Sequence, residues 1–239
     1  MEELQLSLPS FNGNEIIIRE GAAVPHKDPE KMNISGDINT VTAFVTKRKP
    51  VTEGYQYLDP NKVIVTVDNG KRCIKIDLDP HNPHVAKLTA TLEISDELQK
   101  FGINTSKQYK REELVKLIKF NRLDFDDADE HSKILAAYMG FNAKAFIEMK
   151  QEADQRGNKA QNFVKTVDTN IPNLFILNIP IFKGQESQRF RVEICLDVTD
   201  GGAYFWLESV ELNEIMKTQQ AIIFAEQLKC CQDYVIVNV

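Results

Sequence analysis

The segment from Asp77 to His84 (DLDPHNPH) places two carboxylates and two imidazoles within eight residues. Carboxylate oxygens and imidazole nitrogens are ligands for zinc and for harder cations, so the segment can be considered as a metal site. Two prolines stiffen it, however, and no HExxH-type spacing supports it. We therefore favour a polar loop between strands and predict neither a metal site nor a cofactor. The alternative is a metal-dependent hydrolase that uses Asp77, Asp79, His81 and His84.

Four further side chains define the predicted contact surface. Arg189 and Arg191 lie on the outward face of one expected strand, and Tyr204 and Trp206 lie on the same face of its hairpin partner. Arginines and aromatic rings on one sheet face can stack a nucleobase or bind an anion. The C-terminal helix can also cover this face, with arginine stacked on tryptophan as packing. We favour packing, but these four residues remain the predicted binding surface.

Residues 101–122 contain six basic and two acidic residues, a local charge of +4. Such a run can meet a nucleic-acid backbone. The acidic residues between Asp124 and Glu130 follow directly, and we expect them to cancel much of this charge. They lack the glycine and the spacing of a calcium loop, and acidic residues are favoured at a helix start. We interpret the two runs as a solvated helix face and a helix N-terminus.

Catalytic motifs are missing from the sequence, which contains no GxSxG, Walker or GxGxxG pattern and no Cys–His arrangement. The four cysteines form no CxxC pair and match no zinc ligand set. Free thiols are typical of a reducing compartment. The N-terminus has no signal-peptide pattern, and no run reaches the length of a membrane span. We expect a cytoplasmic protein that is not an enzyme.

The first half of the chain predicts a hairpin and a third strand. Residues 63–67 and 72–78 are strand-like and flank Asn69-Gly70, a pair that tolerates the positive φ angles of a type I′ turn. Apolar and polar residues alternate over 88–94, which is typical of an antiparallel strand with one solvated face. Further strands are expected at residues 15–20, 145–152, 159–168 and 234–239.

Helices are expected at Asp37–Arg48, at Lys110–Arg122, from Asp127 onward and at Glu211–Lys229. Asp37 is a suitable N-cap, and Asp127 with Glu130 predicts a capping box. Glu112 precedes Lys116 by four residues, which favours an ion pair on the helix surface. We therefore expect a helical block over residues 96–143.

The second half predicts another hairpin. Apolar residues alternate strictly over 189–198, and Gly201-Gly202 can form a two-residue loop that sets Val198 opposite Phe205 and Leu196 opposite Leu207. A one-residue slip would exchange the two faces of the sheet. Leu174–Phe182 is apolar, and Pro180 in it indicates an edge strand or a bulge.

Length and composition limit the class of protein. The chain has 239 residues, a net charge of −6 and 42% hydrophobic residues. This balance excludes a strongly basic nucleic-acid-coating protein and a disordered acidic protein. Strands occur in antiparallel runs without βαβ alternation. We predict an α+β fold, with an extended antiparallel β-sheet, a central helical block and a C-terminal helix, in one domain over residues 1–239. Residues 1–35 are poorly patterned.

Several segments also resemble those of a known family. They are EELVKLIKFNRLDF (Glu112–Phe125), IPIFKG (Ile179–Gly184), RFRV (189–192), the Gly201-Gly202 turn and WLE (206–208). Over about residues 35–230 the chain resembles a phage and prophage family of unknown function that includes the YfdQ-type proteins. The resemblance implies a phage-encoded cytoplasmic protein whose gene lies near recombination and early functions. It implies no activity and no site.

These observations lead to three hypotheses about function. The first is a phage accessory protein that acts by binding a protein partner or a second copy of itself, linked to phage DNA metabolism, recombination or host takeover. The second is single-stranded nucleic-acid binding through Arg189, Arg191 and Trp206. The third is the metal-dependent hydrolase.

Overall fold

The computed structural model describes residues 31–47, 59–82, 85–141, 171–199 and 202–239. The strands expected at 15–20, 145–152 and 159–168 lie outside this part of the chain. The residues from Lys31 onward form one unit.

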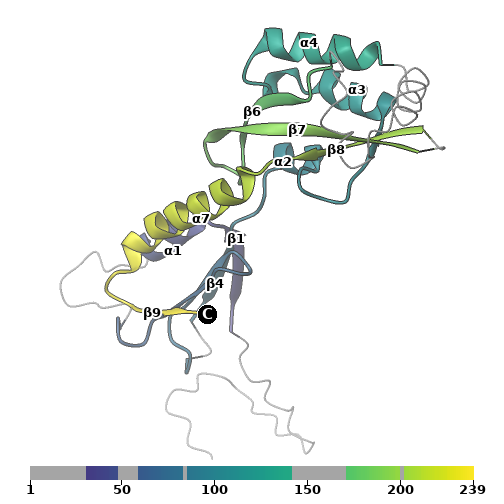
Figure 1. The fold of residues 1–239 in the computed structure, drawn as a ribbon. Helices are drawn as coiled ribbons and strands as arrows, with labels where there is room; N and C mark the ends of the chain where they lie inside the picture. The colour runs from purple at the N-terminus through teal and green to yellow at the C-terminus, as the bar shows by residue number, and fades with distance from the viewer. Residues whose placement is uncertain (1–30, 48–58, 83–84, 142–170, 200–201) are drawn as a thin grey trace, which may run out of the picture. The chain divides into compact units, whose positions relative to one another are not determined.

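A five-stranded sheet is built from the first half of the chain and its last strand (Figure 1). Its order is β1 (Asn33–Asp37), β4 (Lys87–Thr91), β3 (Cys73–Asp77), β2 (Ile64–Asp68) and β9 (Val235–Asn238). The predicted hairpin is the antiparallel pair β2–β3, and β4 pairs with β3 in the same way. The pairs β1–β4 and β2–β9 are parallel, which the sequence did not predict.

A four-stranded antiparallel sheet combines the short strand β5 with three strands from the second half of the chain. Its order is β5 (Tyr109–Lys110), β8 (Gly202–Glu208), β7 (Ser187–Thr199) and β6 (Leu174–Pro180). Pro180 predicted an edge strand or a bulge over Leu174–Phe182; β6 has only one neighbour and is an edge strand, and it ends at Pro180.

The helices complete an α+β fold. They are α1 (Thr40–Thr46), α2 (Asp96–Phe101), α3 (Arg111–Phe120), α4 (Ala128–Met139) and α7 (Leu212–Leu228), with short 3₁₀ turns at Arg122–Asp124 and Lys229–Cys231. The central helical block and the C-terminal helix are thus confirmed. Among the described residues, no helix is long and apolar enough to cross a membrane.

The core joins the helices to the sheets in one hydrophobic cluster. The ring of Phe125 stacks on Phe175 of β6 at 5.0 Å, and Tyr138 of α4 meets Phe205 of β8 edge-on at 5.5 Å. These rings hold α4 and the segment before it against one face of the four-stranded sheet.

The turn of the first hairpin differs from the prediction. Cys73 pairs with Asp68, so the loop has four residues, and the positive φ (52°) falls on Arg72 rather than on Asn69 or Gly70. The carboxylate of Asp68 accepts a hydrogen bond from the amide of Lys71 at 2.9 Å. This side-chain bond satisfies the loop backbone without a type I′ turn.

The second hairpin has a different register from the predicted one. Thr199 pairs with Gly202, so Leu196 lies opposite Phe205 rather than Leu207. The partner of each residue shifts by two positions, which leaves the inward faces unchanged because side chains alternate with a period of two. The hydrophobic pattern alone cannot distinguish two such registers.

Three local predictions about the helices are also wrong in detail. Asp37 ends β1 instead of capping α1, although its carboxylate accepts from the amide of Asn39 at 2.8 Å. Glu130 does not complete a capping box, because its carboxylate accepts from the amide of Ile176 at 3.1 Å. The carboxylate of Glu112 pairs with its neighbour Arg111 at 2.9 Å instead of Lys116.

Candidate functional site

The four predicted contact residues share one face of the β7–β8 hairpin. Arg189 and Arg191 are exposed, and Tyr204 and Trp206 are half-buried. Trp206 lies opposite Cys195, four residues along β7 from Arg191. At about 3.3 Å per residue, some 13 Å of strand separates the two positions. The structure therefore places Tyr204 and Trp206 on neighbouring positions of this face. The arginines lie further along β7 and not beside these two aromatic residues.

Three of these side chains, those of Arg189, Arg191 and Trp206, already have an acidic partner. Arg189 pairs with Asp126, and the guanidinium of Arg191 lies 3.8 Å from the carboxylate of Glu211. The indole N–H of Trp206 donates to the carboxylate of Glu208 at 2.7 Å. An anion at this face would have to compete with these carboxylates.

The segment that begins at Asp77 is held by two lysines outside it and by a hydrogen bond within it. Asp77 pairs with Lys31, and Asp79 lies 3.5 Å from Lys62. Asp79 also accepts from the backbone amide of His81 at 3.0 Å, and this hydrogen bond lowers the pKa of Asp79. Among the described residues, which do not include His84, no group of three potential ligands is placed to hold a metal ion.

The acidic residues after α3 are engaged in tertiary contacts. Asp124 pairs with Lys100 of α2, and Asp126 pairs with Arg189 of β7. Asp127 caps α4 by accepting from the amide of Asp129 at 2.9 Å, while Glu130 binds the backbone of β6. In the described structure, Asp129 is the one member of this cluster whose carboxylate forms neither an ion pair nor a hydrogen bond. The other four carboxylates have partners outside α3, so they do not pair with the basic residues of that helix.

Side chains and loops cover the outer edge of β6 and the part of β8 that extends beyond its short neighbour β5. At the outer edge of β6, Ile176 donates to Glu130 and accepts from the amide of Asp126 at 3.0 Å. Beyond β5, Asn104 donates its backbone N–H to Leu207 of β8 at 2.9 Å and binds Ser209 through its side chain. Strand segments covered in this way cannot pair with another strand.

The outer edge of β9, by contrast, has no neighbouring strand among the described residues. This strand is the last of its sheet, and its apolar side chains Val235, Ile236 and Val237 are between 39% and 49% exposed. Ile64, opposite Val235 on β2, is exposed on the same face. The sequence predicted the strand but gave no signal that it would lie at an edge.

Comparisons with known protein families, curated proteins and solved structures find no match for this chain. The resemblance to the phage and prophage family therefore stays a prediction.

Proposed function

We propose that this chain is a binding protein that engages a protein partner through the outer edge of β9. The supporting observation is a contrast: the outer side of β6 and the part of β8 beyond β5 are covered, whereas the apolar strand β9 has no neighbouring strand on its outer side in the described structure. An exposed, hydrophobic edge strand is a template for pairing with another chain. Addition of a strand to such an edge is a recurrent mode of peptide recognition.

The direction of the backbone groups fits strand addition. Val239 donates its N–H to Val67 of β2 at 2.9 Å. Peptide groups point alternately to the two edges of a strand, so Ile236 and Asn238 direct theirs away from β2. These two residues supply the donors and acceptors that a partner strand would meet.

The side chains of β9 add an apolar contact without charge repulsion. No residue from Tyr234 to Val239 has a charged side chain. Like charges directly opposite each other destabilise strand pairs, and this strand offers none. The partner strand would therefore be apolar too, and a second copy of β9 satisfies this condition.

The proposal also includes the compartment in which the protein acts, which the cysteines indicate. None of the four cysteines forms a disulfide, and the Sγ atoms of Cys230 and Cys231 are within hydrogen-bonding distance of each other at 3.6 Å. Free thiols fit a reducing compartment such as the cytoplasm. Together with the resemblance stated above, this supports a phage accessory protein that acts on a phage or host protein.

Two variants at one position test the proposal. Asn238→Pro removes the outward N–H, while Asn238→Ala removes the same side chain and keeps that N–H. The partner is identified by photo-crosslinking from a benzoyl-phenylalanine placed at position 238 and is then purified with the protein. We expect Asn238→Pro to weaken binding at least tenfold and Asn238→Ala to leave it nearly unchanged.

Hydrogen exchange on the purified complex gives an independent measurement. The amides of Ile236 and Asn238 should exchange more slowly in the complex than in the free protein. Sedimentation velocity of the protein alone shows whether the partner is a second copy. Unchanged exchange at both amides, or equal binding by the two variants, would contradict strand addition at β9.

A further inference from the structure

An open groove of about 450 Å³ lies beside α3 and is not part of the β9 edge. Its lining consists of Lys107, Gln108, Tyr109, Glu113, Lys116, Leu117, Phe120 and Asn121. Tyr109 is fixed there because its hydroxyl donates to the carbonyl of Phe101 at 2.7 Å. The ammonium group of Lys107 lies 4.9 Å from the centre of the Tyr109 ring. The groove thus combines a fixed aromatic residue with cations.

Phe120 is the exception among the phenylalanines that the structure describes. Its side chain is 77% exposed, whereas every other described phenylalanine is at most 6% exposed. It follows Lys116 by four residues on α3, so the two lie on the same face of the helix. An aromatic ring left in water beside a groove can stack on a flat ligand.

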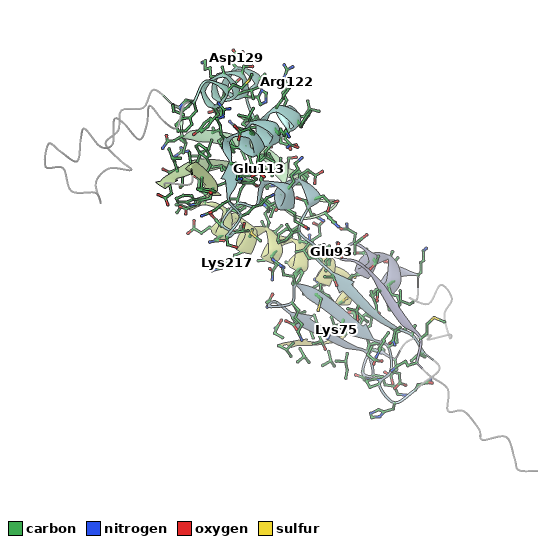
Figure 2. All side chains as sticks on the ribbon, turned by 90° about the vertical axis from the view of Figure 1, so that its right-hand side faces the viewer. Lys75, Glu93, Glu113, Arg122, Asp129 and Lys217 are labelled. Carbon is green, nitrogen blue, oxygen red and sulfur yellow. The ribbon has the colours of Figure 1, made fainter. Side chains whose placement is uncertain are left out.

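The cations on and near α3 keep their charge available. Lys116, Lys119 and Arg122 make no ion pair within the described structure, and the ammonium group of Lys107 contacts the Tyr109 ring and the carbonyl of Lys100, the latter at 3.0 Å, but no carboxylate in the described structure. The acidic cluster that follows in sequence pairs largely with Lys100, with Arg189 and with backbone amides. Figure 2 labels Glu113 in the first turn of α3, Arg122 after its last turn and Asp129 in the first turn of α4.

The geometry points to a binding site for single-stranded nucleic acid in this groove. Phe120 stacks on a base, and Lys107, Lys116, Lys119 and Arg122 contact the phosphates. An exposed aromatic ring with several uncompensated cations is the chemistry that such strands require. The site is separate from the β9 edge and does not depend on the function proposed there.

The lining favours nucleic acid over an acidic amphipathic helix. Gln108, Glu113 and Asn121 interrupt the apolar surface of the groove. An amphipathic helix needs a continuous hydrophobic groove for its apolar face. Polar side chains in the same positions can instead hydrogen-bond the edges of an unstacked base.

Fluorescence anisotropy with a labelled fifteen-nucleotide oligo-dT tests the site. Binding should be measurable at low salt, where contacts between the cations of the groove and the phosphates are strongest, and should weaken as salt rises. Phe120→Ala should reduce the affinity about tenfold or more. Replacing Lys116 and Lys119 with Gln should lower the slope of log affinity against log salt by about 1.4.

Two matched variants serve as controls. Leu123→Ala removes an exposed apolar side chain that does not line the groove, and Lys217→Gln removes a cation from α7. Neither should change the affinity by more than twofold. The substituted side chains are exposed, and circular dichroism verifies that each variant is folded.

The proposal is overturned by any of three results. The first is no salt-dependent anisotropy change with oligo-dT at low salt. The second is equal affinity of wild type, Phe120→Ala and the Lys116/Lys119 double variant. The third is displacement of the oligonucleotide by an equal concentration of a peptide of fifteen glutamate residues. This result would make the groove a site for an acidic protein segment.

Discussion

Asn104 covers the part of β8 that extends beyond its neighbour β5, and its substitution tests whether side chains stabilise the uncovered parts of the sheet. Its side chain donates to the carbonyl of Ser209 and accepts from the amide of Ser209, each at 2.8 Å. Its backbone has a φ of 57°, which asparagine tolerates better than alanine does. The residue therefore contributes through two hydrogen bonds and through its backbone conformation.

The expected loss of stability follows from these two contributions. Each hydrogen bond contributes about 1 kcal/mol, so Asn104→Gly should lower the free energy of unfolding by about 2 kcal/mol. Asn104→Ala also has to adopt the left-handed conformation, which adds about 1 kcal/mol. Asn213→Ala, an exposed asparagine on α7, is the control and should change stability by less than about 0.5 kcal/mol.

Urea unfolding of the four proteins measures these differences. Both Asn104 variants should also show faster amide exchange at Ser209, because its N–H has lost its acceptor. Equal destabilisation by alanine and glycine would refute the reasoning about φ. A loss below about 0.5 kcal/mol for both would show that the two hydrogen bonds do not stabilise this edge.

Three further predictions concern single side chains. Tyr109→Phe removes the hydroxyl that donates to the carbonyl of Phe101, and calorimetry should show a loss of about 1–2 kcal/mol. Burial, followed by the nearby carboxylates of Glu208 and Glu193, raises the pKa of the Cys195 thiol to about 12, so iodoacetamide at pH 8 should modify this cysteine far more slowly in the folded protein than in urea. The hydrogen bond from the Lys71 amide lowers the pKa of Asp68 below its usual 3.8. The stability that this carboxylate contributes is therefore present above about pH 4 and disappears as the pH falls through the lowered pKa. Acid unfolding of Asp68→Asn should lack this pH-dependent loss of stability.

The strands and helices were predictable wherever a strong periodic pattern met a local signal. The alternation over 88–94 and 189–198 and the apolar stripe of the C-terminal helix identify elements that the structure contains. Pro180 marked an edge strand correctly because a proline cannot donate to a sheet ladder.

Pairings between distant segments were not predictable from pattern. The parallel neighbours of β1 and β2 come from strands that lie more than 50 residues away along the chain. Periodicity shows which face of a strand is buried but does not show which strand lies beside it. For the same reason the sequence identified 234–239 as a strand and gave no indication that its outer edge would be open.

The electrostatics of α3 show why charge counted along the chain can mislead. The acidic run after this helix is its neighbour in sequence, and cancellation of charge was the natural expectation. In the fold, Asp124 and Asp126 find cations on α2 and β7 instead. Arg189, predicted as a binding residue, neutralises one of these carboxylates. Because opposite charges in contact cancel most of their field at a distance, the lysines of α3 meet less opposing charge than the sequence suggests. The anion-binding capacity of α3 therefore depends on ion pairs formed by two other elements, and no count over residues 101–130 contains that information.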